Sequence, residues 1–196
     1  MRYPTESQGS IFPTPIWHKR VEEEELPKIE ELRQWALRLE KTDKGEVRSN
    51  RKNTFHSVAT RDFSTLPHFD LLKKKLEFLP SFDFDGWWIN VQRKGDYNIA
   101  HTHPNSDIAF IWYLTDNYKS LVFNQSSYEM TRTRLYQAYK KMNHLDEFNP
   151  FLLNWRWKCN PGDLLVFPAD LLHWTEPHTK RQPRICISGN LTMNNY

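Results

Sequence analysis

Cysteine is scarce in this sequence. Of the 196 residues only Cys159 and Cys186 are cysteines, and neither lies in a CxxC pair. A small secreted scaffold held together by disulfides needs more cysteines than this, so that class of protein is excluded. We therefore expect a protein of a reducing compartment and predict a cytoplasmic location.

Long apolar runs are missing as well. The longest strongly apolar run, IAFIWYL, has seven residues, whereas a membrane-spanning helix needs about 20. The N-terminal stretch MRYPTESQGSIFPTPIW contains no continuous apolar segment, so we expect no signal peptide. The sequence predicts a soluble protein without a membrane partner.

A strong excess of one charge is also absent. Lys and Arg number 27 and Asp and Glu 24, which gives a formal net charge of +3. Nucleic-acid-binding domains usually have a marked basic excess, so we do not expect a nucleic-acid partner. Aromatic residues, in contrast, make up 14% of the chain and supply enough large side chains for a sizeable core. We predict a single domain spanning residues 1–196.

The N-terminal part, residues 1–85, has helical patterns. Within residues 22–41, apolar side chains recur near helical spacing behind the acidic run EEEE, which is favourable at a helix N-terminus. The run PHFDLLKKKLEFL, residues 67–79, places its leucines on one face and its lysines on the other. Both segments are predicted to be helices.

After Gly86 the sequence changes to short β-rich runs separated by turn residues. The predicted strands are WWINVQR, YNIAHTH, DIAFIWYL, SLVFNQ, FLLNWRWKC, LLVFP, LLHW and RICISGNLT. Residues 126–150 interrupt them with a predicted basic amphipathic helix. This pattern predicts a mainly β fold, in which residues 86–196 form a β-sandwich or jelly-roll barrel and residues 1–85 pack on it.

Three histidines of the β-rich part form the most informative pattern. His101 and His103 are two residues apart in GDYNIAHTHPNSD, so an alternating strand would place both side chains on one face. His173 ends the later segment GDLLVFPADLLH. Because neutral imidazoles suit Fe, Zn, Cu and Ni, the three histidines predict a metal site. The remaining histidines lack such context, and most of them are expected to be solvated or locally hydrogen-bonded; they are His18, His56, His68, His144 and His178.

Arg184 is the second informative residue, because it begins the strand RICISGN eleven positions after His173. If this strand returns antiparallel, Arg184 lies inside the barrel, deeper than the metal. A guanidinium there needs an anionic partner, and its planar fork suits a carboxylate. Ser188 has an even spacing from Arg184 and could face the same way. An exposed arginine at a strand edge is the alternative.

Taken in order, several segments resemble the 2-oxoglutarate/Fe(II)-dependent oxygenases, and among them the branch named Putative 2OG-Fe(II) oxygenase. These segments are IFPTPIW, RSNRKNTFHS, NIAHTHPNS with IWYL, NPGDLLVFPADLLHWTEP and RICISGN. The resemblance implies a cupin-like double-stranded β-helix (jelly roll) with Fe(II) and 2-oxoglutarate as cofactors. It also implies O2-dependent hydroxylation of an unidentified small-molecule or peptide substrate, with release of succinate and CO2.

The resemblance also implies roles for single residues. It makes His101 and His173 iron ligands, and Arg184 the residue that holds the far carboxylate of 2-oxoglutarate. Ser188 and Tyr113, the latter in IWYL, are further candidates for contacts with 2-oxoglutarate. Beyond the metal ligands, no catalytic residue is implied.

The chain departs from the superfamily pattern at one position. Most members have HxD or HxE in the first motif, whereas here the residue two after His101 is His103. We favour His103 as the third ligand, in an all-histidine site. Asp107, which follows across the PNS turn, is the alternative third ligand.

The same segments also resemble the two cupin motifs. The matching positions are Gly95, His101, His103 and Asp107 in the first motif and Gly162, Pro168 and His173 in the second, where Asp170 replaces the expected glycine. A cupin-type dioxygenase or isomerase that does not use 2-oxoglutarate is therefore the alternative function. A ligand-binding barrel without activity is a third hypothesis, and a homodimer is compatible with all three.

Overall fold

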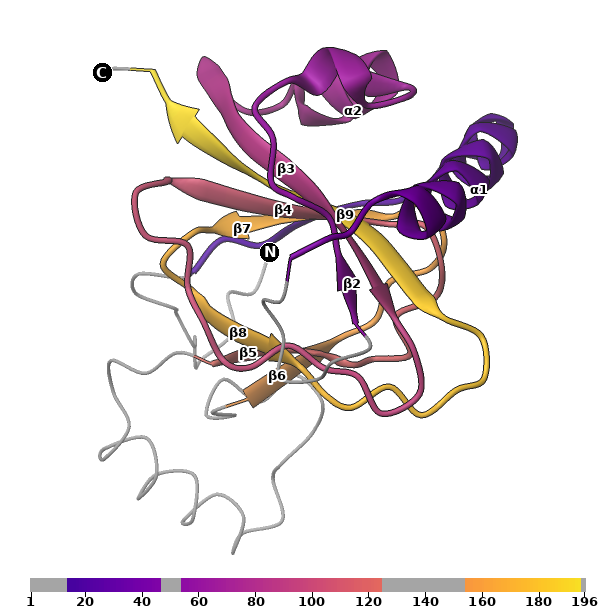
Figure 1. Cartoon of the computed structure of the whole chain (residues 1–196). Helices are drawn as coiled ribbons and strands as arrows, with labels where there is room; N and C mark the ends of the chain where they lie inside the picture. The colour runs from indigo at the N-terminus through magenta and orange to yellow at the C-terminus, as the bar shows by residue number, and fades with distance from the viewer. Residues whose placement is uncertain (1–13, 47–53, 125–153, 195–196) are drawn as a thin grey trace, which may run out of the picture.

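The computed structural model describes residues 14–46, 54–124 and 154–194, which form two antiparallel sheets and two α-helices (Figure 1). The larger sheet has the strand order β1-β7-β4-β9-β3-β2 and the smaller sheet the order β6-β5-β8. The strands are β1 (Trp17–Lys19), β2 (Phe55–His56), β3 (Phe82–Gln92), β4 (Ile108–Tyr113), β5 (Leu121–Asn124), β6 (Asn154–Trp157), β7 (Leu164–Pro168), β8 (Leu172–Thr175) and β9 (Arg184–Met193). The predicted mainly β fold with flanking helices is confirmed.

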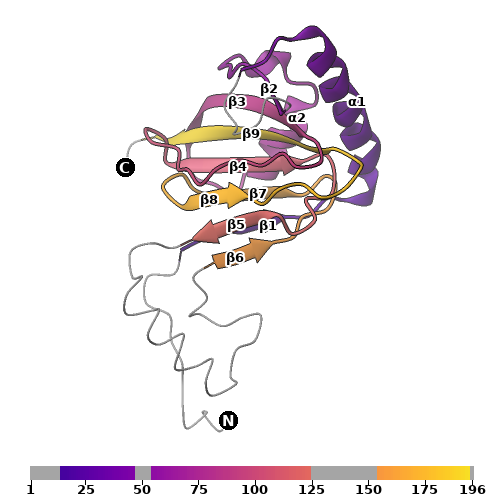
Figure 2. The ribbon, with the colours of Figure 1, turned by 60° about the horizontal axis from the view of Figure 1, so that its bottom comes forward.

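Both predicted helices are present, as α1 (Leu26–Thr42) and α2 (Phe69–Leu76), and the 3-10 turns η1 (Glu23–Glu25) and η2 (Phe63–Thr65) precede them. The two helices lie on the outer face of the large sheet, and the small sheet lies on its other side (Figures 1 and 2). A buried ion pair of 2.6 Å between Lys75 Nζ and a Glu25 carboxylate oxygen ties η1 to α2. None of the helices in these ranges is both long and apolar enough to cross a membrane.

Two apolar clusters lie on opposite faces of the large sheet. Alternation along β9 sends Ile185 and Ile187 to the outer cluster under the helices, and Cys186 to the inner cluster between the sheets. The outer face is tightly packed at Gly189, where a Cβ atom would lie 2.4 Å from the Phe110 ring. The helices therefore stabilise the outer face, and the inner face is left for the polar residues of the site.

The antiparallel register sets the order of the inner residues. Three rows of side chains cross this face: Trp88–Ser188–Ile111, then Asn90–Cys186–Tyr113, then Gln92–Arg184. Same-face neighbours on a strand are about 6.8 Å apart, because each residue advances the strand by about 3.4 Å. Arg184 therefore lies two rows away from Ser188 along β9.

One predicted strand, YNIAHTH at residues 97–103, is wrong. This segment forms no named strand, and a single bridge pairs His101 with His173. The backbone N–H of His101 donates to the His173 carbonyl at 2.9 Å, and that of His103 donates to the Ala169 carbonyl at 2.8 Å. Because these hydrogen bonds go to different segments, no continuous ladder forms. The predicted helix within 126–150 lies outside the described residues.

Candidate metal centre

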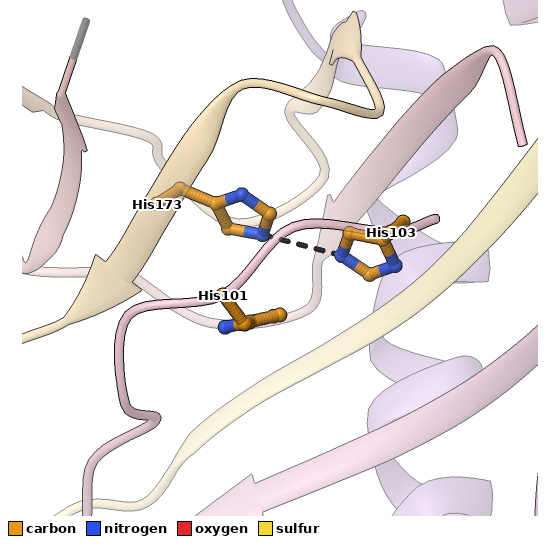
Figure 3. A group of neighbouring side chains, drawn as sticks. All are labelled: His101, His103 and His173. Atoms are coloured by element: carbon orange, nitrogen blue, oxygen red, sulfur yellow. Dashed lines mark hydrogen bonds between the residues drawn. The ribbon is translucent and has the colours of Figure 1, made fainter. Parts of the chain in front are cut away.

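Three histidine side chains come together at the end of the inner face where β4 begins. His101 and His103 lie on the segment before β4, and His173 lies on β8 (Figure 3). The Nε2 atoms of His103 and His173 are 3.3 Å apart, and their rings are parallel within 3°. The His101 ring centroid lies 4.4 Å from that of His173. Each histidine offers one ring nitrogen, and the three nitrogens all lie within 4.8 Å of one another.

Backbone carbonyl groups orient two of the three rings. The Nδ1 atom of His101 lies 2.7 Å from the carbonyl oxygen of Ile99, and Nδ1 of His173 lies 2.8 Å from that of Leu171. A carbonyl oxygen can only accept, so both Nδ1 atoms carry a proton, and in the neutral form of each ring the lone pair is on Nε2. Metal-binding histidines typically have such a hydrogen bond at the second nitrogen.

The His103 ring is held by stacking. It lies between the Trp88 ring, at a centroid distance of 5.6 Å, and the His173 ring, at 5.1 Å. Since Nε2 of His173 has the lone pair, Nε2 of His103 must donate in the contact between them. A bound cation would take the place of this proton and attract both lone pairs.

The protonation states suit a metal ion. Burial lowers the pKa of His103 to about 4 and that of His173 to about 3, and the nearby His101 contributes to both shifts. The two imidazoles are therefore neutral at neutral pH, as coordination requires. Two nitrogens that bind one ion, each about 2.1 Å from it, lie at most about 4.2 Å apart. The 3.3 Å distance between the Nε2 atoms of His103 and His173 is within this limit. The three residues fit an ion such as Fe(II).

The carboxylate of Asp107 is engaged elsewhere. Its Oδ2 atom accepts a hydrogen bond of 2.7 Å from the backbone N–H of Met193, at the end of β9. Among the described residues, the possible metal ligands that lie close together at this site are His101, His103 and His173. Asp107 does not belong to this group.

Arg184 lies at the opposite end of the inner face and is 1% exposed. Its guanidinium donates from Nε to Gln92 Oε1 at 2.8 Å, from Nη1 to the Ser120 hydroxyl, and from Nη2 to the Glu176 carbonyl at 3.4 Å. All three acceptors are neutral, and within residues 14–46, 54–124 and 154–194 no ion pair includes Arg184. Burial lowers the pKa of Arg184, but arginine keeps its proton in proteins. A buried cation without an anion is costly, so this end of the barrel suits an anionic ligand.

The other two predicted cofactor contacts lie in different rows. Tyr113 is buried in the middle row, where burial raises its pKa and its hydroxyl is hydrogen-bonded to the Asn117 side chain. Ser188 lies in the row nearest the histidines, beside Asn90, and makes no hydrogen bond to Arg184 in the described ranges. The serine that accepts a hydrogen bond from the Arg184 guanidinium is Ser120, and no sequence pattern predicted this contact.

A small cavity of about 30 Å³ adjoins the three histidines. Its walls also include Trp88, Asn90, Ser188 and Leu121. Leu121 follows Ser120, which contacts the guanidinium of Arg184. Arg184 and Ser120 themselves are not among the residues that line this cavity.

A second cluster of metal-type ligands, His18, Cys159 and Asp163, is closed by its own hydrogen bonds. The Asp163 carboxylate accepts from His18 Nε2 at 3.0 Å and from the Asn160 N–H at 2.8 Å. Nδ1 of His18 accepts from Trp157 Nε1 at 3.3 Å, and burial raises the pKa of the Cys159 thiol. These contacts join β1 to the barrel, so this cluster is structural.

Comparisons with known proteins identify the family and the fold. The family model described as Putative 2OG-Fe(II) oxygenase matches residues 86–190. Among curated protein sequences, no significant match is found.

Several solved structures share the fold. HygX from Streptomyces hygroscopicus, with nickel and 2-oxoglutarate bound, is 14% identical, with a TM-score of 0.60 over 93% of this chain and 84% of that one. A Pseudomonas putida prolyl-4-hydroxylase is 11% identical, with a TM-score of 0.59 over 93% and 94%. The alpha-ketoglutarate-dependent epimerase SnoN of nogalamycin biosynthesis is 12% identical, with a TM-score of 0.63 over 92% and 78%. The shared fold is the double-stranded β-helix.

Proposed function

The chain belongs to the family described as Putative 2OG-Fe(II) oxygenase, and from this premise we propose that it hydroxylates a small-molecule or peptide substrate with release of succinate and CO2. The family uses Fe(II) and 2-oxoglutarate as cofactors. One observation carries the proposal: three neighbouring histidines and a buried arginine with only neutral hydrogen-bond acceptors lie at the two ends of the inner face.

The three histidines would hold the metal through Nε2. Bound iron, together with 2-oxoglutarate and O2, supplies the oxidation that inserts oxygen into a C–H bond of the substrate. The chain's part is to keep the lone pairs of His101 and His173 directed inward, through the carbonyls of Ile99 and Leu171. Trp88 stacks on His103 and fixes the plane of the third ring.

Arg184 would bind the far carboxylate of 2-oxoglutarate. Its fixed hydrogen bonds to Gln92 and Ser120 hold the guanidinium in place without neutralising it. A neutral amide at position 92 matters here, because a carboxylate there would take the charge that the ligand needs. We assign Tyr113, in the middle row, to the central part of 2-oxoglutarate, and Ser188 to its metal-proximal part.

The test of this function is conversion of 2-oxoglutarate to succinate. Purified protein is incubated under air with Fe(II), ascorbate and 2-oxoglutarate, and succinate is measured by mass spectrometry. We expect slow, iron-dependent turnover that the His173→Ala variant lacks. Equal succinate formation by wild type and His173→Ala, or none by either, would contradict the proposal.

One observation favours a second candidate. The ligand group contains histidine alone, whereas a carboxylate completes the site in most oxygenases of this superfamily. A cupin-type metalloprotein that does not use 2-oxoglutarate would have such a site. It would bind metal through the same residues, but replacement of Arg184 would leave its activity intact.

A further inference from the structure

The side-chain amide of Asn90 is only half satisfied. Asn90 lies on β3, is 3% exposed and forms part of the cavity wall beside the histidines. Its Nδ2 atom donates to the Ser188 hydroxyl at 3.4 Å and lies 3.9 Å from Cys186 Sγ. Its Oδ1 atom is buried and has no hydrogen-bond partner. A buried acceptor without a partner is unfavourable, and native proteins rarely keep one without a reason.

The position of this acceptor links it to the site. Among the described residues, other buried unpartnered side-chain oxygens belong to Thr54 and Asn190, and neither residue lines the histidine cavity. Asn90 is in the row next to Trp88, whose ring stacks on His103. A group bound to Asn90 would therefore lie close to the proposed metal.

The chemistry of the acceptor defines its ligand. At neutral pH, 2-oxoglutarate offers two carboxylates and a keto oxygen, all of which are acceptors, so it cannot satisfy Asn90 Oδ1. The missing partner must carry an O–H or N–H group. No Asp, Glu, Lys or Arg is found among the cavity residues whose positions are described, so the wall beside Asn90 favours a neutral donor over a charged one.

Asn98 contributes the complementary group. Its Oδ1 atom accepts from Gln92 Nε2 at 2.9 Å, and Asn98 also lines the cavity. Because its oxygen is engaged, its NH2 group is the part with donor capacity left. The wall thus offers one acceptor and one donor, next to the aromatic rings of Trp88 and Trp174.

We propose that Asn90 determines substrate specificity by accepting a hydrogen bond from a neutral hydroxyl or amide N–H of the substrate. The inference rests on the proposed function and names the chemical class of its substrate. The competing arrangement is the reversed amide, in which Ser188 donates to Oδ1 and the NH2 group faces a carboxylate of 2-oxoglutarate. In that arrangement Asn90 binds 2-oxoglutarate and not the substrate.

The first readout is the stability of the protein without ligand. Asn90→Leu has similar size and removes the unpartnered acceptor, so we expect the melting temperature to stay equal or rise. Asn190→Leu, at an unpartnered oxygen outside the cavity, is the matched control for the substitution itself. A large drop in melting temperature for Asn90→Leu alone would show a structural role and overturn the proposal.

The second readout is binding of a defined probe. Zn(II)-loaded, 15N-labelled protein with 2-oxoglutarate is titrated with acetamide, which has N–H donors, and with N,N-dimethylacetamide, which has none. We expect acetamide to shift the Asn90 amide signals and to bind roughly tenfold more tightly than the dimethyl compound. Asn90→Leu removes this difference and Asn190→Leu keeps it.

Two results would overturn the inference. One is equal binding of both probes to wild type and Asn90→Leu. The other is loss of 2-oxoglutarate affinity in Asn90→Leu with the probe difference unchanged, which assigns Asn90 to the cofactor. Calorimetry of 2-oxoglutarate on the same samples tests the proposed function separately, because its failure would appear in wild type and in every variant alike.

Discussion

Arg184 and Gln92 lie directly opposite each other on β9 and β3, and the guanidinium Nε donates to the Gln92 amide oxygen at 2.8 Å. The partner of this buried cation is a neutral amide. Asp96 attracts the guanidinium from farther away, but no described carboxylate forms an ion pair with it, so it is available to a ligand that carries a carboxylate.

Gln92→Glu should therefore weaken 2-oxoglutarate binding. The new carboxylate would form an ion pair with Arg184, so we expect at least a roughly tenfold loss of affinity by anaerobic calorimetry. Metal affinity should stay unchanged, since the histidines lie at the other end of the inner face. Gln92→Met removes the hydrogen bond without adding charge and should have a smaller effect. Wild-type affinity in Gln92→Glu would show that Arg184 does not bind the cofactor.

Metal binding should depend on the three histidines and not on Asp107. We expect His101→Ala, His103→Ala and His173→Ala each to lower the affinity for Fe(II) or Zn(II) by more than roughly 100-fold, because each removes a ligand. Asp107→Asn should retain metal, since its carboxylate contacts the Met193 N–H. Metal analysis after gel filtration measures the bound ion.

A further variant separates the two candidates for the third ligand. His103→Asp recreates the two-histidine, one-carboxylate pattern and should keep a bound ion. Retention of metal by His103→Ala together with its loss in Asp107→Asn would assign the third position to Asp107.

Gly189→Ala should destabilise the fold. The added Cβ would lie 2.4 Å from the Phe110 ring and 2.6 Å from the Gly86 carbonyl oxygen. We expect the free energy of unfolding to fall by about 1–3 kcal/mol in urea titrations. Gly86→Ala is the control, because its Cβ would meet the Thr60 carbonyl at an ordinary 3.5 Å. Equal effects of the two substitutions would contradict the tight packing at Gly189.

The Asp163 carboxylate should make stability depend on pH in the acid range. Burial alone would raise its pKa, but hydrogen bonds from His18 and from the N–H groups of Asn160 and Val21 outweigh this effect and lower it. The contribution of this carboxylate to the free energy of unfolding is thus complete above its ordinary pKa of 3.8. It is lost as the pH falls through the lower pKa that the group has in the folded protein.

Asp163→Asn tests this dependence. We expect the variant to be less stable by about 1–3 kcal/mol at pH 7, the usual effect of losing a hydrogen bond to a charged group. The difference from wild type should shrink below about pH 4. A difference that stays constant down to pH 3 in urea titrations would rule out a role for the ionised carboxylate.

Sequence patterns predicted the strands well where the apolar alternation was clear. The segment 97–103 was predicted as a strand because of its composition, but strand formation requires a continuous partner, and its N–H groups bond to separate segments. The spacing of His101 and His103 did predict that the two side chains share a side, and they do so without a regular strand. A local sequence pattern predicts how side chains alternate between the two sides of a segment. It does not predict which segments will pair with its backbone.

The surroundings of Arg184 could not be predicted in the same way. Gln92 and Ser120 contact the guanidinium from 92 and 64 positions away in the sequence. Both contacts depend on the register between strands and on the turn before β5, where Tyr118 and Lys119 have positive φ angles. No local signal defines such a contact.

The most direct test of 2-oxoglutarate chemistry at the three histidines is an anaerobic titration. Fe(II)-loaded protein is titrated with 2-oxoglutarate, and the visible charge-transfer absorption of the iron–2-oxo-acid complex is recorded. We predict a saturable band in wild type, no band in His173→Ala, and saturation only at a roughly tenfold higher concentration in Arg184→Gln. The absence of any band in iron-loaded wild-type protein would contradict the assignment of this site to 2-oxoglutarate.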